Sequence, residues 1–235
     1  MAQLILPQSR RSVTAVADKS DLRDEWVYSA IVAGYGGTGQ QTAFTVPKGQ
    51  NIPRLVGSSI APTSSHQLTY ADGTTNITQA GQLGSALGDA SIRGIGITVE
   101  QVGYNDTTGV ANAYGAGPLE QAEIASKLHF RLRIAGKDQI QGPTILFPSF
   151  GALFGSSFAS TTAAATTMFG GVISNGWPSS GKRLKVPIMV GRTDTLEGFL
   201  TVSGSSTLNF TTSTGQGNCS LVWVTLMTLL KGDVR

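Results

Sequence analysis

The segment Leu128-His129-Phe130-Arg131-Leu132-Arg133-Ile134 has the most regular side-chain pattern in the chain. Apolar residues alternate with polar ones, so one face carries leucine, phenylalanine and isoleucine, and the other carries His129, Arg131 and Arg133. Successive side chains of a β-strand point to opposite faces, and a period of two therefore predicts a strand with one buried and one exposed face. The segment indicates a β-rich core with water or a partner on its outer side.

Short apolar segments separated by glycine and proline predict further strands. They are 26–32, 44–46, 95–99, 144–147, 184–190, 198–202, 207–211 and 221–230. Pro187 favours an edge or a bulge for its strand. We expect a turn at 136–138, a hairpin around 204–206, and a short helix at 119–126 with Pro118 at its first position. About eight to ten short strands with almost no helix are typical of an all-β antiparallel sandwich, jelly roll or barrel.

Three segments lack a strand period and are expected to be loops, at 34–39, 103–117 and 150–173, and the polar stretch 71–88 is expected to be a long surface excursion with weak strands. The segment 150–173 is apolar but consists of small residues and phenylalanine. Uncharged loops of this composition pack well against another subunit and poorly against water. Phe150, Phe154, Phe158 and Phe169 are therefore predicted subunit contacts.

Residues 1–25 contain a cluster of charged side chains without an apolar period, and we interpret them as an extended N-terminal arm before a single β domain at 26–235. Arg10, Arg11 and Arg23 are the predicted subunit contacts of this arm. A plain disordered terminus is the alternative. No secretory signal and no membrane-spanning segment are expected.

Charged residues make up 13% of the 235 residues, the net charge is +3, and 30 residues are glycine. Because a surface poor in charge tends to associate, this composition suits a protein that hides surface against copies of itself. A secreted sandwich with a Ser/Thr-coated face is the alternative. Cys219 is the single cysteine and is expected to be a small buried side chain, so no intramolecular disulfide is expected.

Three motifs of enzymes and cofactor sites have simpler interpretations. The glycines of 34–39 match G-x-G-x-x-G, but no helix is predicted after them, which favours a loop over a dinucleotide site. His66 has no G-x-S-x-G elbow to suggest a hydrolase. Asp194 and Glu197 resemble a glycosidase carboxylate pair, and a charged loop is the preferred interpretation. We therefore expect no enzymatic activity, no cofactor and no metal.

His129, Arg131 and Arg133 form a basic stripe on one strand face. Facing packaged nucleic acid, the stripe would neutralise phosphates without reading sequence. Facing a neighbouring subunit, it would pair with carboxylates, and facing water it would do little. The last two interpretations are preferred over nucleic acid.

The charged arm, the strand 128–134, the turn 135–138 and the apolar strand 221–230, followed by Lys231-Gly232-Asp233, together resemble the jelly-roll capsid proteins of non-tailed bacteriophages and viruses. The resemblance is architectural and implies a single jelly roll with long loops that assembles into an icosahedral shell, either as the shell subunit or as a vertex or minor subunit. It further implies copies of itself and other capsid proteins as partners, non-specific contact with packaged nucleic acid or an internal membrane, and no small-molecule substrate. The expected location is the virion, after synthesis in the host cytoplasm.

The main alternative is a carbohydrate- or receptor-binding β-sandwich of the spike or adhesin type. Such a module needs aromatic side chains on an open face. Trp26 and Trp223 are predicted to lie in the core, which leaves Trp177, before Pro178 in a Gly/Ser-rich loop, as the candidate. An enzyme is the third hypothesis.

Overall fold

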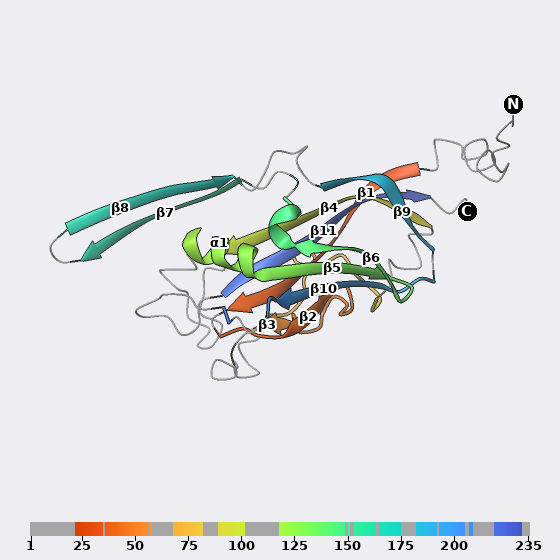
Figure 1. The fold of residues 1–235 in the computed structure, drawn as a ribbon, viewed down its shortest axis with the longest axis horizontal. Helices are drawn as coiled ribbons and strands as arrows, with labels where there is room; N and C mark the ends of the chain where they lie inside the picture. Colours follow the sequence, from red (N-terminus) through yellow and green to blue (C-terminus); the bar gives the residue numbers. More distant parts are fainter. Residues whose placement is uncertain are drawn as a thin grey trace, which may run out of the picture.

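The computed structural model shows an all-β protein made of two sheets and one separate hairpin (Figure 1). The residues that the structure describes are 22–34, 36–55, 57, 68–81, 89–101, 118–148, 150, 153–162, 165–174, 182–191, 193–204, 207–208 and 219–231. The predicted all-β class is thereby confirmed.

The larger sheet has five strands in the order β3-β1-β11-β4-β9. The strands are β1 (Leu22–Gly34), β3 (Arg54–Leu55), β4 (Ala90–Gln101), β9 (Lys182–Val190) and β11 (Cys219–Lys231). All neighbours are antiparallel except β1 and β3. The predicted last strand is thus confirmed as β11, and it lies in the centre of its sheet. β1 begins at Leu22, so the end of the predicted arm, including Arg23, belongs to a strand.

The smaller sheet has four antiparallel strands in the order β2-β10-β5-β6. They are β2 (Gln40–Ala43), β5 (Leu128–Ile134), β6 (Lys137–Pro143) and β10 (Leu196–Val202). Before β5 lies the helix α1 (Pro118–Lys127), close to its predicted bounds, and after β6 lies the 3-10 turn η5 (Thr144–Leu146). No helix among the described residues is long and apolar enough to cross a membrane.

The core lies between the two sheets. β5 alternates buried and half-buried residues along its whole length, as its sequence predicts, and Leu128, Phe130, Leu132 and Ile134 point inward. They meet the inward residues of β1, β4 and β11, and the fully buried side chains there include Ile31, Ile95 and Val224. One continuous apolar layer therefore holds the sheets together.

Phe44 does not begin a strand, contrary to the prediction for 44–46. It follows β2 in a left-handed backbone conformation, with φ of 70°, and its side chain is fully buried. A Cβ added to Gly198 of β10 would lie 3.0 Å from the Phe44 ring, so the missing side chain at Gly198 leaves the room for Phe44. Core packing outweighs the cost of the unusual backbone here.

β5 and β6 are joined by a two-residue turn at Ala135 and Gly136, one position earlier than predicted. Both residues have positive φ, at 48° and 76°, which is the geometry of the tight turn that suits the twist of a hairpin. The predicted continuation of the partner strand through 144–147 is wrong, because this segment contains η5.

The predicted hairpin between 198–202 and 207–211 is also wrong in its described part. β10 pairs with β2 and β5, and residues 207–208 are outside any strand. Leu208 instead exchanges backbone hydrogen bonds with the glycine-rich segment, since its N–H donates to Gly37 and its C=O accepts from Gly36.

β9 is the edge strand that Pro187 predicts. Its pairing with β4 is also interrupted, because Ile92 pairs with Ile188 whereas Gly94 pairs with Arg183. The residues around Pro187 therefore bulge away from the ladder, as expected for a residue that has no N–H to donate.

The predicted loop at 150–173 is largely a β-hairpin. β7 (Leu153–Thr162) and β8 (Ala165–Ser174) pair with each other through ten register positions and with no other described strand. Figure 1 shows this hairpin projecting away from both sheets. Its sequence lacks the apolar alternation from which a strand is predicted, and its strands pair with neither sheet.

Replacing the fully buried Phe130 by alanine should lower the free energy of unfolding by roughly 3–5 kcal/mol, because it removes a large core side chain that packs edge-on against Phe147. The neighbouring His129→Ala on the outer face is the matched control and should change stability by less than about 0.5 kcal/mol. Urea unfolding followed by circular dichroism measures both. Equal effects would contradict the inward and outward assignment of β5.

Candidate functional site

The outer face of the five-stranded sheet carries aromatic side chains. Trp26 and Tyr28 in β1, and Trp223 in β11, alternate with residues buried in the core and therefore point away from it. Trp26 is 45% exposed, and the rings of Tyr28 and Trp223 lie 6.1 Å apart. The prediction that Trp26 and Trp223 are core residues is wrong, because β1 and β11 have apolar residues on both faces.

Phe150 lies on this same face. Its ring meets the ring of Trp26 edge to face, with 4.9 Å between centroids. A Cβ added to Gly94 or Gly96 of β4 would come within 2.8 Å or 2.6 Å of the Phe150 ring. The ring therefore packs directly on these two glycines, where a side chain would leave no room for it. Phe150 therefore packs on its own sheet, where a contact to another subunit was predicted. We call Trp26, Tyr28, Trp223 and Phe150 the aromatic face.

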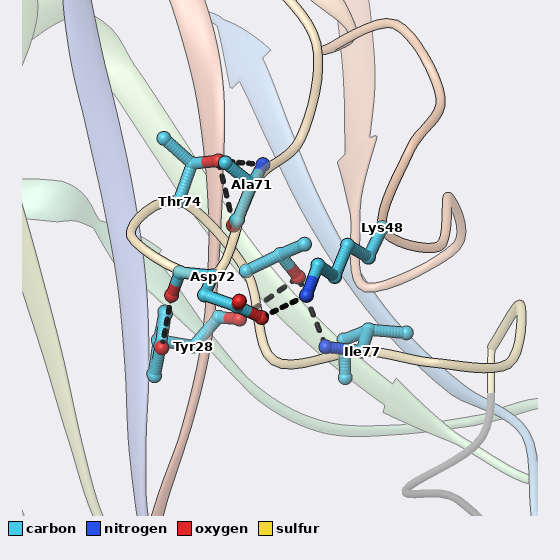
Figure 2. Close-up of polar contacts among 7 residues, drawn as sticks. Tyr28, Lys48, Ala71, Asp72, Thr74 and Ile77 are labelled. Atoms are coloured by element: carbon cyan, nitrogen blue, oxygen red, sulfur yellow. Dashed lines mark hydrogen bonds and ion pairs between the residues drawn. The ribbon is translucent and has the colours of Figure 1, made fainter.

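A loop at 70–77 covers the free edge of β1 next to the aromatic face (Figure 2). The Tyr28 hydroxyl donates to the carbonyl oxygen of Asp72, and the Asp72 carboxylate pairs with Lys48. Thr74 closes the turn, because its hydroxyl oxygen accepts a hydrogen bond from the Ala71 N–H at 2.8 Å.

The side chain of Asn76 makes the hydrogen bonds to β1 that a neighbouring strand would otherwise make. Its side-chain oxygen accepts from the Tyr28 N–H at 2.9 Å, and its side-chain nitrogen donates to the Trp26 carbonyl at 2.6 Å. Thr75 and Ile77 are buried beside it, at 0% and 2% exposure. The segment was predicted as a surface excursion, and this described part of it is instead packed against β1.

Tyr70 joins the loop to the sheet from within. Its buried hydroxyl donates to the Ala30 carbonyl and accepts from the Ser29 hydroxyl at 3.2 Å. Burial raises the pKa of Tyr70 to about 12, while the bond from Ser29 acts in the opposite direction. Tyr70, Val32 and Ile52 form a small second core on the outer side of β1, separate from the core between the sheets.

The basic stripe lies on the outer face of the four-stranded sheet, as predicted. Arg133 donates from Nε to Oδ1 of Asp138 at 2.8 Å, and Arg131 lies 3.6 Å from the other carboxylate oxygen. Both guanidinium groups also stack on the ring of Phe199, at 4.6 Å and 5.1 Å from its centroid. The hydrogen bond from Arg133, aided by the two positive charges, lowers the pKa of the Asp138 carboxyl.

The two arginines of the stripe are thus engaged within their own sheet. Arg131 stands opposite Phe199, and Arg133 stands opposite Glu197, which adds a second negative charge. Planar guanidinium groups that stack on an aromatic ring and bind a carboxylate shield that ring from water. This arrangement favours a stabilising role on the sheet surface over phosphate binding. His129 stands opposite Thr201 and is half-buried.

The remaining predicted motifs have structural roles where the structure describes them. The side chain of Asp194 accepts from the Gly191 N–H at 2.8 Å and so closes a turn, while Glu197 lies in β10. The glycine-rich segment is followed by β2 and not by a helix. A Cβ added to Gly37 would meet the Leu55 carbonyl oxygen at 2.3 Å, so close chain packing explains the glycine there. Within the described ranges, no three His, Cys, Asp or Glu side chains gather as a metal site would require.

The other predicted contacts are placed in part. Arg10, Arg11, His66 and Trp177 lie outside the described residues. Arg23 lies in β1, where its backbone pairs with Leu230 of β11. Phe154 and Phe158 belong to β7, and Phe169 of β8 pairs with Phe158. The predicted phenylalanines therefore divide between the hairpin and the sheet surface at its base.

No family model, curated protein or solved structure matches this chain.

Tyr70→Phe should lower the free energy of unfolding at pH 7 by about 1–3 kcal/mol, because the buried Ala30 carbonyl loses its donor. Tyrosine in the unfolded chain ionises near its ordinary value of 10.0, and in the folded chain near about 12. The unfolded state thus releases its proton first, and wild-type stability falls as the pH rises through this window. The difference in free energy of unfolding between wild type and Tyr70→Phe, measured by urea titration, should therefore become smaller as the pH rises from 10.0 to about 12. A gap independent of pH would contradict the buried position of Tyr70.

Gly96→Ala should cost about 1–3 kcal/mol of stability, because the new methyl group displaces the Phe150 ring. In a Phe150→Ala background the same change should be nearly neutral, giving a coupling of about 1 kcal/mol or more. Gly73→Ala is the control, since an added Cβ meets nothing within 4 Å there. Additive effects in thermal unfolding would show that Phe150 does not rest on Gly96.

Proposed function

We propose that this chain is the structural subunit of an icosahedral virus or bacteriophage capsid, built on a single jelly roll. The observation that carries the proposal is the pairing of its strands. Capsid shells, lectin domains and cupins are among the proteins that use the jelly roll, so the strand pairing supports a protein of one of these kinds, and the surfaces favour the capsid subunit among them.

The strand pairing supports a jelly roll as follows. Eight strands remain when β3 and the β7–β8 hairpin are left aside, and along the chain the first pairs with the last, the second with the seventh, the third with the sixth and the fourth with the fifth. These are the pairs of one long antiparallel ribbon. The further pairs β11 with β4 and β10 with β5 are those made when such a ribbon is rolled into two facing sheets.

Features outside the eight strands support assembly. The hairpin lies between β6 and β9 and projects from the sandwich (Figure 1), and it contains no charged residue. Charged residues are scarce in the whole chain, at 13%. A projecting uncharged element and a weakly charged surface both suit a subunit that buries surface against copies of itself.

The aromatic face favours the second candidate, a carbohydrate- or receptor-binding sandwich. Trp26 is 45% exposed and shares its sheet face with Tyr28 and Trp223. Flat exposed aromatic rings are suited to stacking on sugar rings, so this face is a candidate that the sequence analysis missed, while Trp177 lies outside the described residues. Phe150 already covers one side of Trp26, which reduces the open area.

The mass of the native assembly tests the proposal. We expect light scattering after size exclusion, across a salt series, to give closed particles or capsomers of defined size, and electron microscopy to show shells or rings. A monomer at every salt concentration would contradict a capsid role. A monomer that binds glycans, and loses binding in Trp26→Ala but not in Tyr70→Phe, would establish the second candidate.

A further inference from the structure

Both outer edges of the β7–β8 hairpin lack a strand partner among the described residues. Each strand has ten residues, and their mutual register runs from Leu153 opposite Ser174 to Thr162 opposite Ala165 without a shift. At about 3.3 Å per residue, each edge presents roughly 33 Å of backbone donors and acceptors. A two-stranded ribbon alone in water is marginally stable. The hairpin is therefore an element that another strand would complete.

The hairpin also lacks the devices that keep edges apart. Natural proteins protect edge strands by lysine and other charges, by proline, by bulges or by shortness. The sequence from 153 to 174 contains no charged residue and no proline. Its edges are long, regular and uncharged, which is the combination that pairs with another chain.

The edge strand of the larger sheet is protected by contrast. β9 carries Lys182, Arg183 and Lys185, all exposed, and it contains Pro187 and a break in register. At the opposite edge, β3 has two residues, and the neighbouring stretch of β1 is covered by the loop at 70–77. Neither edge offers a long free ladder.

The smaller sheet is protected in the same ways. β6 begins with Lys137 and Asp138, ends with Pro143, and has a register shift opposite Leu132. β2 at the other edge has four residues. Among the edges that the structure describes, those of the hairpin alone are both long and unprotected.

We propose that the β7–β8 hairpin pairs edge to edge with the same hairpin of a second copy of this chain. The inference rests on the proposed function as a self-assembling subunit and names its interface. Because every other described edge is protected, the acceptor for a hairpin edge is the identical hairpin. Two equal strands pair antiparallel about a two-fold axis, and their lack of charge removes repulsion between them.

The base of the hairpin prepares it for this contact. Phe150, three residues before β7, rests on Gly94 and Gly96 and against Trp26, which ties the start of the hairpin to the outer face of β4. An element fixed at its base loses less freedom on pairing than a free loop would. The two-fold contact would thus join subunits while the jelly-roll body stays unchanged.

Two lysines in the hairpin test this pairing. In Ser157→Lys/Phe169→Lys, one charge lies near the centre of each strand. A two-fold antiparallel contact brings the centre of a strand beside the centre of its copy, so either pairing edge meets a like charge. The dissociation constant of the dimer should rise about tenfold or more, because like charges facing each other across an interface repel strongly. Thr78→Lys/Gln139→Lys, at exposed positions of the body, should assemble as wild type does. Light scattering measures assembly, and thermal unfolding should show an intact body in both variants.

Cysteine cross-linking gives an independent readout that does not depend on the hairpin tolerating lysine. In a Cys219→Ala background, Ser157→Cys or Gly170→Cys, each near the centre of its strand, should form disulfide-linked dimers with copper phenanthroline, and Thr78→Cys should not. Wild-type assembly with neither cross-link, and with no effect of the hairpin lysines, would overturn the hairpin interface and leave the capsid proposal standing. A wild-type monomer would overturn both.

Discussion

The antiparallel pairing of β1 with β11 is the contact on which the rest of the fold depends. It joins the first and last described strands through thirteen register positions, from Leu22 opposite Lys231 to Gly34 opposite Cys219. β11 then pairs with β4, so the core of the larger sheet exists only once this long-range ladder has formed. Closing so long a loop costs conformational entropy before the contacts between the two strands have formed, and such topologies fold slowly. Burial of the inward apolar residues of both strands offsets this entropy cost.

The sequence reveals those strands that have one buried and one exposed face. β5 was predicted within its observed bounds because Leu128, Phe130 and Leu132 meet the core while Arg131 and Arg133 do not. The all-β class and the edge position of the Pro187 strand followed from equally local signals. β6 was located poorly because its edge position leaves it with exposed polar residues at most positions.

Two kinds of feature were hidden from the sequence. β1 and β11 are apolar on both faces, so nothing in their pattern tells that Trp26 and Trp223 point outward while Val27 and Val224 point inward. The hairpin strands lack apolar alternation in sequence and pair with neither sheet, and Phe150 lies in the same uncharged stretch as the hairpin. Their roles depend on what packs against them: glycines of β4 in one case, and in our proposal a second copy in the other.

The described part of the chain consists of a body whose sheet edges are protected and a hairpin whose edges are not. Hydrogen exchange of the wild type, measured at a concentration where it is assembled and again after dilution to the monomer, tests this division most directly. We expect the amides of β1 and β11 to exchange slowly in both states, and the amides at 153–174 to be protected in the assembly alone. Hairpin amides exchanging equally fast in the assembly and in the monomer would contradict this division.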